Sequence, residues 1–165
     1  MYHYYCPPVI PLPLDTYVLD MERGDVNGDG VVDNVYLVGK KPMGNDSPFR
    51  DNIYIIIQDC RTQRLTRIPL EFDAGYNPRL LLGDFTGNHI PDIYVSIFSG
   101  GSGGFFFTYI YSFANNRVRQ LFDFEEFNQR YRYRASYRDF YAVDVANITT
   151  TRLFGIAIYL KGPEY

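Results

Sequence analysis

The sequence predicts an all-β protein made of repeated four-stranded antiparallel units, each about 59–60 residues long. Two observations support this prediction. The 16 Tyr and 13 Phe residues stand with Ile and Val in short runs between turn-forming residues, which is typical of strands. The chain also resembles itself, because GDVNGDGVVD at residues 24–33 is matched by GDFTGNHIPD at residues 83–92. Each segment leads into an apolar run, and the offset of 59 between them sets the repeat length.

Each unit is predicted to contain, in order, a loop, a strand, a second loop, a strand, a tight turn and a strand. In the first unit these segments are residues 25–33, 35–38, 40–51, 52–58, 59–63 and 64–70. In the second unit they are residues 84–92, 93–97, 99–104, 105–111, 114–116 and 117–122. Residues 79–82 are a candidate for a fourth strand, which approaches the second Asp-rich loop.

A decayed third copy begins at Asp144, 60 residues after Asp84, and leads into an apolar run at residues 154–160. The predicted organisation is an N-terminal arm (1–19) and one β-repeat domain (20–165), with repeats at about 20–78, 79–137 and, in part, 138–165. A closed propeller of such units needs at least about four of them. The expected architecture is therefore an incomplete or open ring of propeller-like blades.

Composition excludes several classes of protein. Hydrophobic residues make up 46% of the chain and charged residues 21%, which indicates a folded domain rather than a disordered one. The net charge of −3 argues against a nucleic-acid partner. No stretch approaches the ~20 apolar residues of a membrane span, and the first residues lack the pattern of a signal peptide. Cys6 and Cys60 could form one disulfide or stay two separate thiols, because geometry decides between these states.

The first loop has the donor pattern of a calcium site. Side chains that carry oxygen occupy its positions 1, 3, 5 and 9, which are Asp25, Asn27, Asp29 and Asp33. Calcium takes 6–8 oxygen ligands, and a loop that curls round the ion turns every second side chain inward. Val31, at position 7, is expected to contribute its carbonyl oxygen. The carboxylate at position 9 closes the site, whereas an EF-hand loop closes with a Glu at position 12.

The second loop repeats this pattern with fewer charges. Its predicted ligands are the side chains of Asp84, Thr86, Asn88 and Asp92 and the carbonyl oxygen of Ile90. Two carboxylates stand where the first loop has three, so a second Ca²⁺ ion is expected to bind here more weakly. The third copy is expected to be metal-free, because Arg152 stands where the closing aspartate belongs.

These loops resemble those of FG-GAP or VCBS-type repeats, which also build the β-propeller head of integrin α chains. The resemblance rests on residues 25–33 and, less closely, on residues 84–92, each preceded by Gly and followed by a strand. It covers most of residues 20–165, and it implies four-stranded blades with calcium held in the loop between two strands. Proteins of this family are commonly extracellular or surface-associated and act in adhesion or ligand binding. The chain also resembles repeat proteins of spore-forming, Bacillus-like bacteria, a similarity that implies no activity.

The expected function is that of a calcium-binding β-repeat module with a structural ion, which binds a protein or glycan ligand at a cell or spore surface. The alternative is a self-assembling structural protein of such a surface, with the N-terminal arm as its docking segment. An enzyme is not expected, since His3 and His89 lie in no nucleophile or metal context and no Gly-x-Ser-x-Gly elbow is present. A propeller hydrolase is the third hypothesis.

Overall fold

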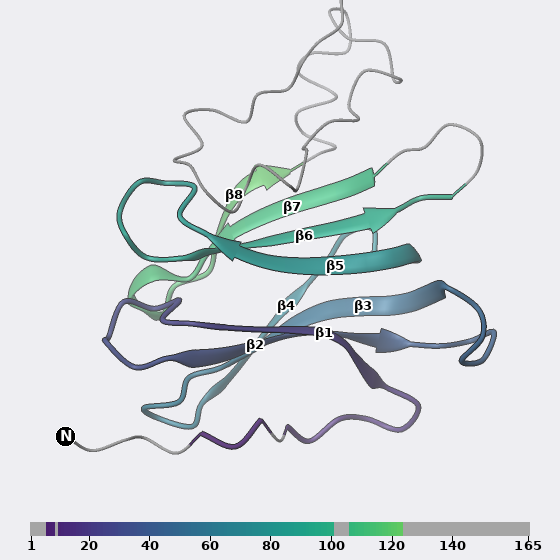
Figure 1. The fold of residues 1–165 in the computed structure, drawn as a ribbon, viewed down its shortest axis with the longest axis horizontal. Helices are drawn as coiled ribbons and strands as arrows, with labels where there is room; N and C mark the ends of the chain where they lie inside the picture. The colour runs from purple at the N-terminus through teal and green to yellow at the C-terminus, as the bar shows by residue number, and fades with distance from the viewer. Residues whose placement is uncertain (1–5, 9, 101–105, 124–165) are drawn as a thin grey trace, which may run out of the picture.

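The described part of the chain is built from two antiparallel β-meanders. The computed structural model describes residues 6–8, 10–100 and 106–123, and one short 3-10 turn, η1 (Ala114–Asn116), accompanies the strands (Figure 1). The first meander consists of β1 (Tyr17–Gly24), β2 (Asp33–Lys40), β3 (Phe49–Gln58) and β4 (Leu65–Pro69). The second meander consists of β5 (Gly75–Gly83), β6 (Asp92–Phe98), β7 (Phe106–Ser112) and β8 (Arg119–Asp123). The predicted all-β class is confirmed.

The eight strands form one open antiparallel sheet. Their order is β1-β2-β3-β5-β6-β7-β8, and β4 pairs with β3 beside this path. The two meanders join where Phe49 pairs with Tyr76 and Arg50 pairs with Gly75. In the described residues the sheet does not close into a ring. The partial third repeat predicted at 138–165 lies outside the described residues. No helix in the described part of the chain is long and apolar enough to cross a membrane.

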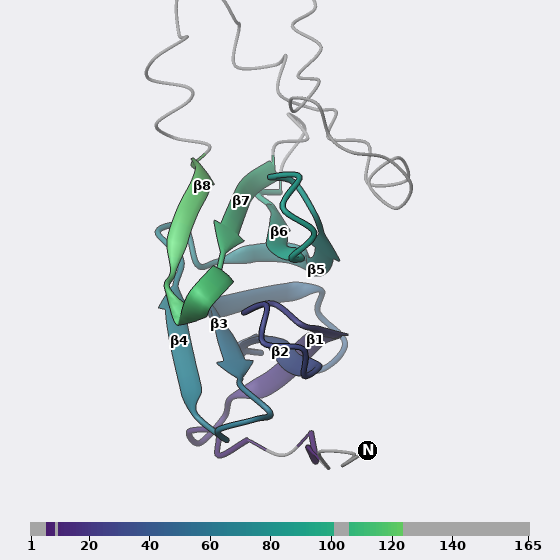
Figure 2. The ribbon, with the colours of Figure 1, turned by 90° about the vertical axis from the view of Figure 1, so that its left-hand side faces the viewer.

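The main hydrophobic core lies between the two meanders, which stack as two layers (Figure 2). Side chains alternate between the two faces of each strand, as the period of a β-strand requires. In β2, Val35 and Leu37 enter this core, whereas Tyr36 and Val38 point to the outer face. The buried members of the core are Val26, Val35, Leu37, Ile53, Ile55, Ile57, Ile68, Leu70, Leu80, Ile93, Val95, Ile97, Tyr109, Tyr111 and Phe113.

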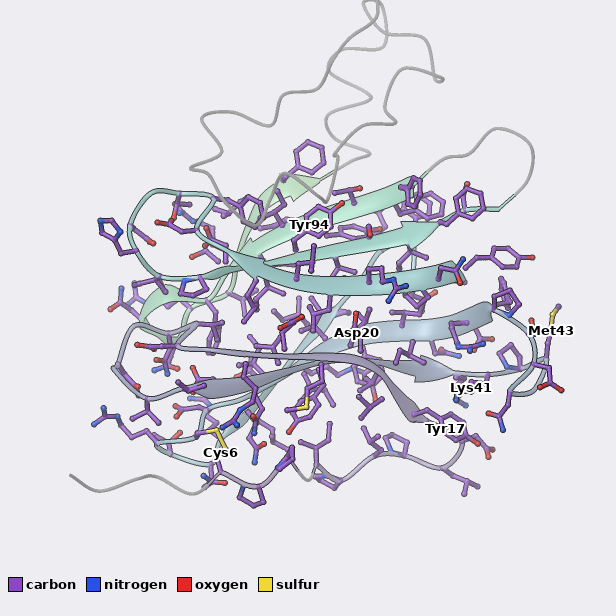
Figure 3. All side chains as sticks on the ribbon, in the orientation of Figure 1. Cys6, Tyr17, Asp20, Lys41, Met43 and Tyr94 are labelled. Carbon is purple, nitrogen blue, oxygen red and sulfur yellow. A yellow bond between two sulfur atoms is a disulfide. The ribbon has the colours of Figure 1, made fainter. Side chains whose placement is uncertain are left out.

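The outer face of the first meander is covered by the N-terminal arm. Ile10 and Leu12 of the arm pack against a cluster that contains the buried side chains of Tyr36, Val38 and Ile56. A disulfide between Cys6 and Cys60 attaches the arm to the turn between β3 and β4, with 5.3 Å between the two Cα atoms (Figure 3). The two cysteines, whose pairing the sequence left open, are therefore bonded.

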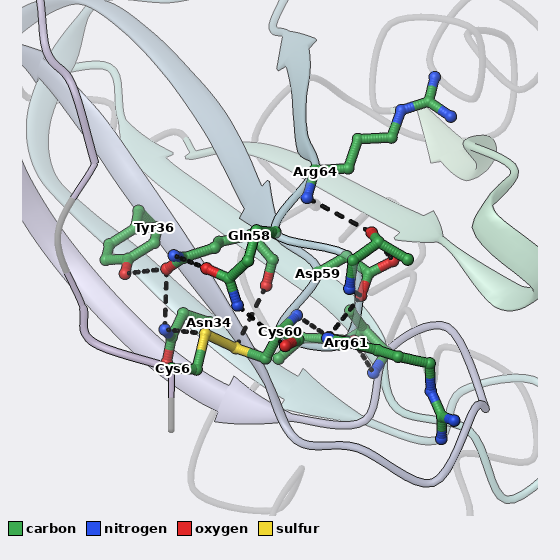
Figure 4. The surroundings of a disulfide bond; sticks show 12 residues. Cys6, Asn34, Tyr36, Gln58, Asp59, Cys60, Arg61 and Arg64 are labelled. Carbon is green, nitrogen blue, oxygen red and sulfur yellow. Dashed lines mark hydrogen bonds between the residues drawn. A yellow bond between two sulfur atoms is a disulfide. The ribbon is translucent and has the colours of Figure 1, made fainter. Parts of the chain in front are cut away.

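Polar side chains surround the disulfide beneath the arm (Figure 4). The Asn34 amide donates to Oε1 of Gln58 at 2.9 Å and to Sγ of Cys6 at 3.3 Å. The Tyr36 hydroxyl donates to the same Gln58 oxygen at 3.0 Å. These bonds hold the end of β3 and the start of β2 in register where the first Asp-rich loop ends.

Candidate metal centre

The first Asp-rich loop joins β1 to β2 and is organised around the carboxylate of Asp25. Oδ1 of Asp25 accepts hydrogen bonds from the backbone amides of Gly28 at 2.8 Å and Asp29 at 3.0 Å. Oδ2 accepts a third bond from the amide of Gly30 at 2.7 Å. Gly28 and Gly30 have φ values of 81° and 85°, a left-handed conformation that glycine adopts without steric cost. The sequence therefore curls this loop around its first carboxylate.

Asp33 closes the loop from the start of β2 and is fully buried. Its Oδ2 accepts a hydrogen bond from the Val26 amide at 3.3 Å, and its Oδ1 accepts one from the Cys60 amide at 3.0 Å. Burial raises the pKa of Asp33 to about 6, and the negative charges of Asp59 and Asp29 act in the same direction. The two amide hydrogen bonds oppose this rise. Ionised Asp33 thus stands in a buried, negatively charged environment.

The side chains at positions 3 and 5 are held by different partners. Oδ1 of Asn27 accepts a hydrogen bond from the Asp29 amide at 3.0 Å, and its Nδ2 donates to Asn116 of η1 at 3.2 Å. Oδ1 of Asp29 accepts the Val31 amide at 2.8 Å, while Oδ2 pairs with Nε of Arg61 at 2.9 Å. Arg61 also donates to the carbonyl oxygen of Asp29. One potential calcium ligand is therefore occupied by a cation from the β3–β4 turn.

Two residues of that turn were not among the predicted site residues. Asp59 is buried, and its carboxylate accepts bonds from the amides of Arg61 and Thr62 and from the Thr62 hydroxyl. Burial acts to raise the pKa of Asp59, but these hydrogen bonds, together with the Arg61 charge, leave it below its usual value. Asp59 and Arg61 are distant from the loop in sequence and belong to an ordinary polar turn, so no sequence signal placed them at this site.

The second loop, between β5 and β6, repeats the hydrogen bonds of the first at the 59-residue offset. Oδ1 of Asp84 accepts the amides of Gly87 at 2.6 Å and Asn88 at 3.1 Å, and Oδ2 accepts the His89 amide at 2.9 Å. Oδ1 of Asn88 accepts the Ile90 amide at 2.9 Å, as Asp29 accepts that of Val31. The two segments therefore share a backbone conformation as well as a sequence pattern.

The closing residue of the second loop, Asp92, is fully buried like Asp33. Its Oδ2 accepts the amides of Phe85 at 3.0 Å and Thr86 at 3.1 Å. Burial raises the pKa of Asp92, a rise opposed by hydrogen bonds from Ser112, Phe85 and Thr86. In the first loop the Cys60 amide donates to Oδ1 of Asp33, but the amide at the equivalent position does not donate to Asp92. Oδ1 of Asp92 is therefore buried without a well-formed hydrogen bond to any described residue. The closing carboxylate of the second loop thus accepts fewer hydrogen bonds than that of the first loop.

The predicted side-chain ligands at positions 1, 3, 5 and 9 lie on the two loops, and the carboxylate and amide oxygens among them accept hydrogen bonds from backbone amides. Val31 and Ile90 follow the position-5 side chains and donate their amides to them. Within residues 6–8, 10–100 and 106–123, no group of three His, Cys, Asp or Glu side chains converges closely enough to hold a metal ion. The third loop, predicted to be metal-free, lies outside this part of the chain.

The chain is similar over most of its length to a known protein. The chain is 38% identical over 143 residues to "Uncharacterized protein YybI" of Bacillus subtilis (strain 168), a match that covers 87% of this chain. No family model matches the chain, and no solved structure matches it. The match covers 54% of YybI, so this chain spans about half the length of the curated relative that it resembles.

Proposed function

We propose that the chain is a calcium-binding β-repeat module in which the ion stabilises the loop between the first two strands of a meander. The observation that carries the proposal is the conformation shared by the two Asp-rich loops. In each, a carboxylate at position 1 accepts three backbone amides, which curls the chain. A loop curled in this way can offer the oxygens of alternate side chains to one calcium ion.

The first loop is the stronger candidate because of its charges. Its three carboxylates are those of Asp25, Asp29 and Asp33. Arg61 forms an ion pair with Asp29. The Arg61 side chain is 44% exposed, so it can swing into solvent at little cost when a divalent cation binds to Asp29. In the second loop Asn88 replaces one carboxylate, so calcium is expected to bind there with lower affinity.

We propose further that the module acts outside the cytoplasm, in adhesion or ligand binding at a cell or spore surface, on the scaffold of a propeller-like, open ring. The Cys6–Cys60 disulfide supports this location, since such bonds persist in oxidising compartments. Millimolar calcium outside cells also suits loop sites of modest affinity. A protein or glycan is the expected ligand, and the ion is expected to be structural rather than catalytic.

A reciprocal pair of substitutions tests calcium binding. Asp29→Asn removes a charge from the first loop but keeps the oxygen that accepts the Val31 amide, and Asn88→Asp adds the corresponding charge to the second loop. Calcium up to roughly 10 mM, about ten times the weakest loop affinities, should raise the melting temperature of wild type. The rise should shrink in Asp29→Asn and grow in Asn88→Asp.

Arg61→Ala is the matched control, because Asp29→Asn also weakens the ion pair with Arg61. This variant loses the ion pair but keeps every loop oxygen, so it should respond to calcium at lower concentration than wild type. A calcium response that is absent, or equal in wild type, Asp29→Asn and Asn88→Asp, would refute the proposed sites. Magnesium in place of calcium separates a specific site from general screening of charge.

A further inference from the structure

The turn between β3 and β4 joins the disulfide to the first Asp-rich loop. Cys60 is bonded through its sulfur to Cys6, and its backbone amide donates to Oδ1 of Asp33 at 3.0 Å. The next residue, Arg61, pairs with Asp29 at 2.9 Å. Two consecutive residues of one turn therefore contact two of the three carboxylates of this loop, and the first of the two carries the disulfide (Figure 4).

The other half of the disulfide reaches the same end of β2. Sγ of Cys6 accepts a hydrogen bond from the side-chain amide of Asn34 at 3.3 Å, and Asn34 directly follows Asp33. All four residues of this contact, the two cysteines with Asp33 and Asn34, are buried. Because protein interiors are closely packed, a shift of either cysteine is transmitted to the point where the loop enters β2.

Reduction of the disulfide must move these cysteines apart. A dithiol reductant supplies two electrons and two protons: the S–S bond breaks, two thiols form, and the reductant becomes a disulfide. Two thiol sulfurs cannot remain at covalent distance, so the turn loses its covalent tie to the arm and keeps only its own hydrogen bonds. Cys60 carries the amide that the Asp33 carboxylate accepts. When Cys60 shifts, the closing carboxylate of the loop loses a hydrogen bond that fixes its position.

The second loop provides an internal comparison. The strand register places Phe113 at the position of Cys60 and Ala114 at the position of Arg61. Phe113 cannot form a disulfide and is buried in the main core, and Ala114 carries no charge. Oδ1 of Asp92 has no well-formed hydrogen bond to a described residue. The redox state of the disulfide therefore has a direct route to the first loop, and the described residues supply none to the second.

We propose that the Cys6–Cys60 disulfide controls the calcium affinity of the first loop, so that the oxidised protein binds the ion there more tightly than the protein reduced by a dithiol. This inference rests on the proposed calcium site. Loss of one hydrogen bond to a buried carboxylate corresponds to at least about tenfold in affinity. Linkage makes the coupling reciprocal. Saturating calcium should therefore lower the reduction potential of the disulfide by at least about 30 mV, which is tenfold for a two-electron couple.

Amide NMR of the full chain reads each loop separately, through Gly30 in the first loop and Gly87 in the second. Calcium titrations compare oxidised wild type, wild type in dithiothreitol, and a double variant, Cys6→Ser with Cys60→Ser, which keeps the backbone amide at position 60. Reduction and the double substitution should each weaken calcium binding at the Gly30 loop by about tenfold and leave the Gly87 loop unchanged. Dithiothreitol added to the double variant should change neither loop, which controls for the reductant itself.

The reduction potential of wild type, measured in dithiothreitol buffers with and without calcium, is a second test that needs no variant. Equal calcium affinity of the first loop in the oxidised and reduced protein, with an unchanged potential, would overturn this proposal and leave the calcium site in place. If calcium shifts the amides of neither loop in the oxidised protein, the site and the proposal are both wrong. If reduction weakens both loops equally, the effect is a general loss of stability, and the local connection is refuted.

Discussion

The Cys6–Cys60 disulfide should provide a large share of the stability of this domain. Cys6→Ser removes the bond, which links positions 54 residues apart. In the chain-entropy model, release of a loop of this length destabilises the folded state by about 4 kcal/mol. For a chain of this size, each kcal/mol corresponds to roughly 2–4 °C, so the melting temperature should fall by roughly 8–16 °C. The arm that covers the Tyr36 face should loosen at the same time.

Urea unfolding at neutral pH measures this effect. If the bond is the cause, Cys6→Ser, Cys60→Ser and the double variant lose the same free energy of unfolding, because either substitution breaks one shared bond. Each variant keeps the Cys60-position amide that donates to Asp33. A reducing agent should lower the unfolding midpoint of wild type to that of the variants and leave the variants unchanged. Two titratable thiols in unfolded, unreduced wild type would refute the reasoning.

Three further predictions concern the loops. Gly28→Ala should destabilise the protein more than Gly30→Ala: both glycines have left-handed φ, but a Cβ at Gly28 would lie 2.5 Å from Cδ1 of Ile90, whereas one at Gly30 would meet nothing within 4 Å. Equal losses in urea unfolding would contradict this steric reasoning. His89→Gly should raise the melting temperature, because His89 has a φ of 65° where the first loop has Gly30, and relief of this strain gains about 1 kcal/mol. A lower melting temperature would show that the imidazole makes a compensating contact. In calcium-free buffer, stability should fall as the pH rises from about 4 through about 6, because folding raises the pKa of Asp33 above the usual 3.8 and favours its protonated form. The loss is at most about 3 kcal/mol, and a urea midpoint that stays flat or rises over this range would contradict the assignment.

Much of the local structure was predictable from the sequence. The glycines and the first carboxylate of each loop dictate a curled turn, and the structure contains that turn twice with matching hydrogen bonds. The apolar runs at 35–38 and 93–97 lie within β2 and β6, because buried strands need β-branched and aromatic side chains on both faces. The strand before the first loop, β1, was not assigned, since its alternation of apolar and charged residues is weak.

The two loops, the order of strands within each unit and the all-β class follow from the sequence, because turn chemistry and hydrophobic period act over neighbouring residues. The groups that reach those loops from elsewhere in the chain depend on the tertiary fold. Arg61 meets Asp29 and the Cys60 amide meets Asp33 because the β3–β4 turn lies beside the first loop, a contact across 27–32 residues. The bond from Cys6 to Cys60 has the same origin, since it depends on how the arm crosses the outer face. The face of each meander that enters the shared core is also decided by packing between the two layers, which no periodicity within a single strand encodes.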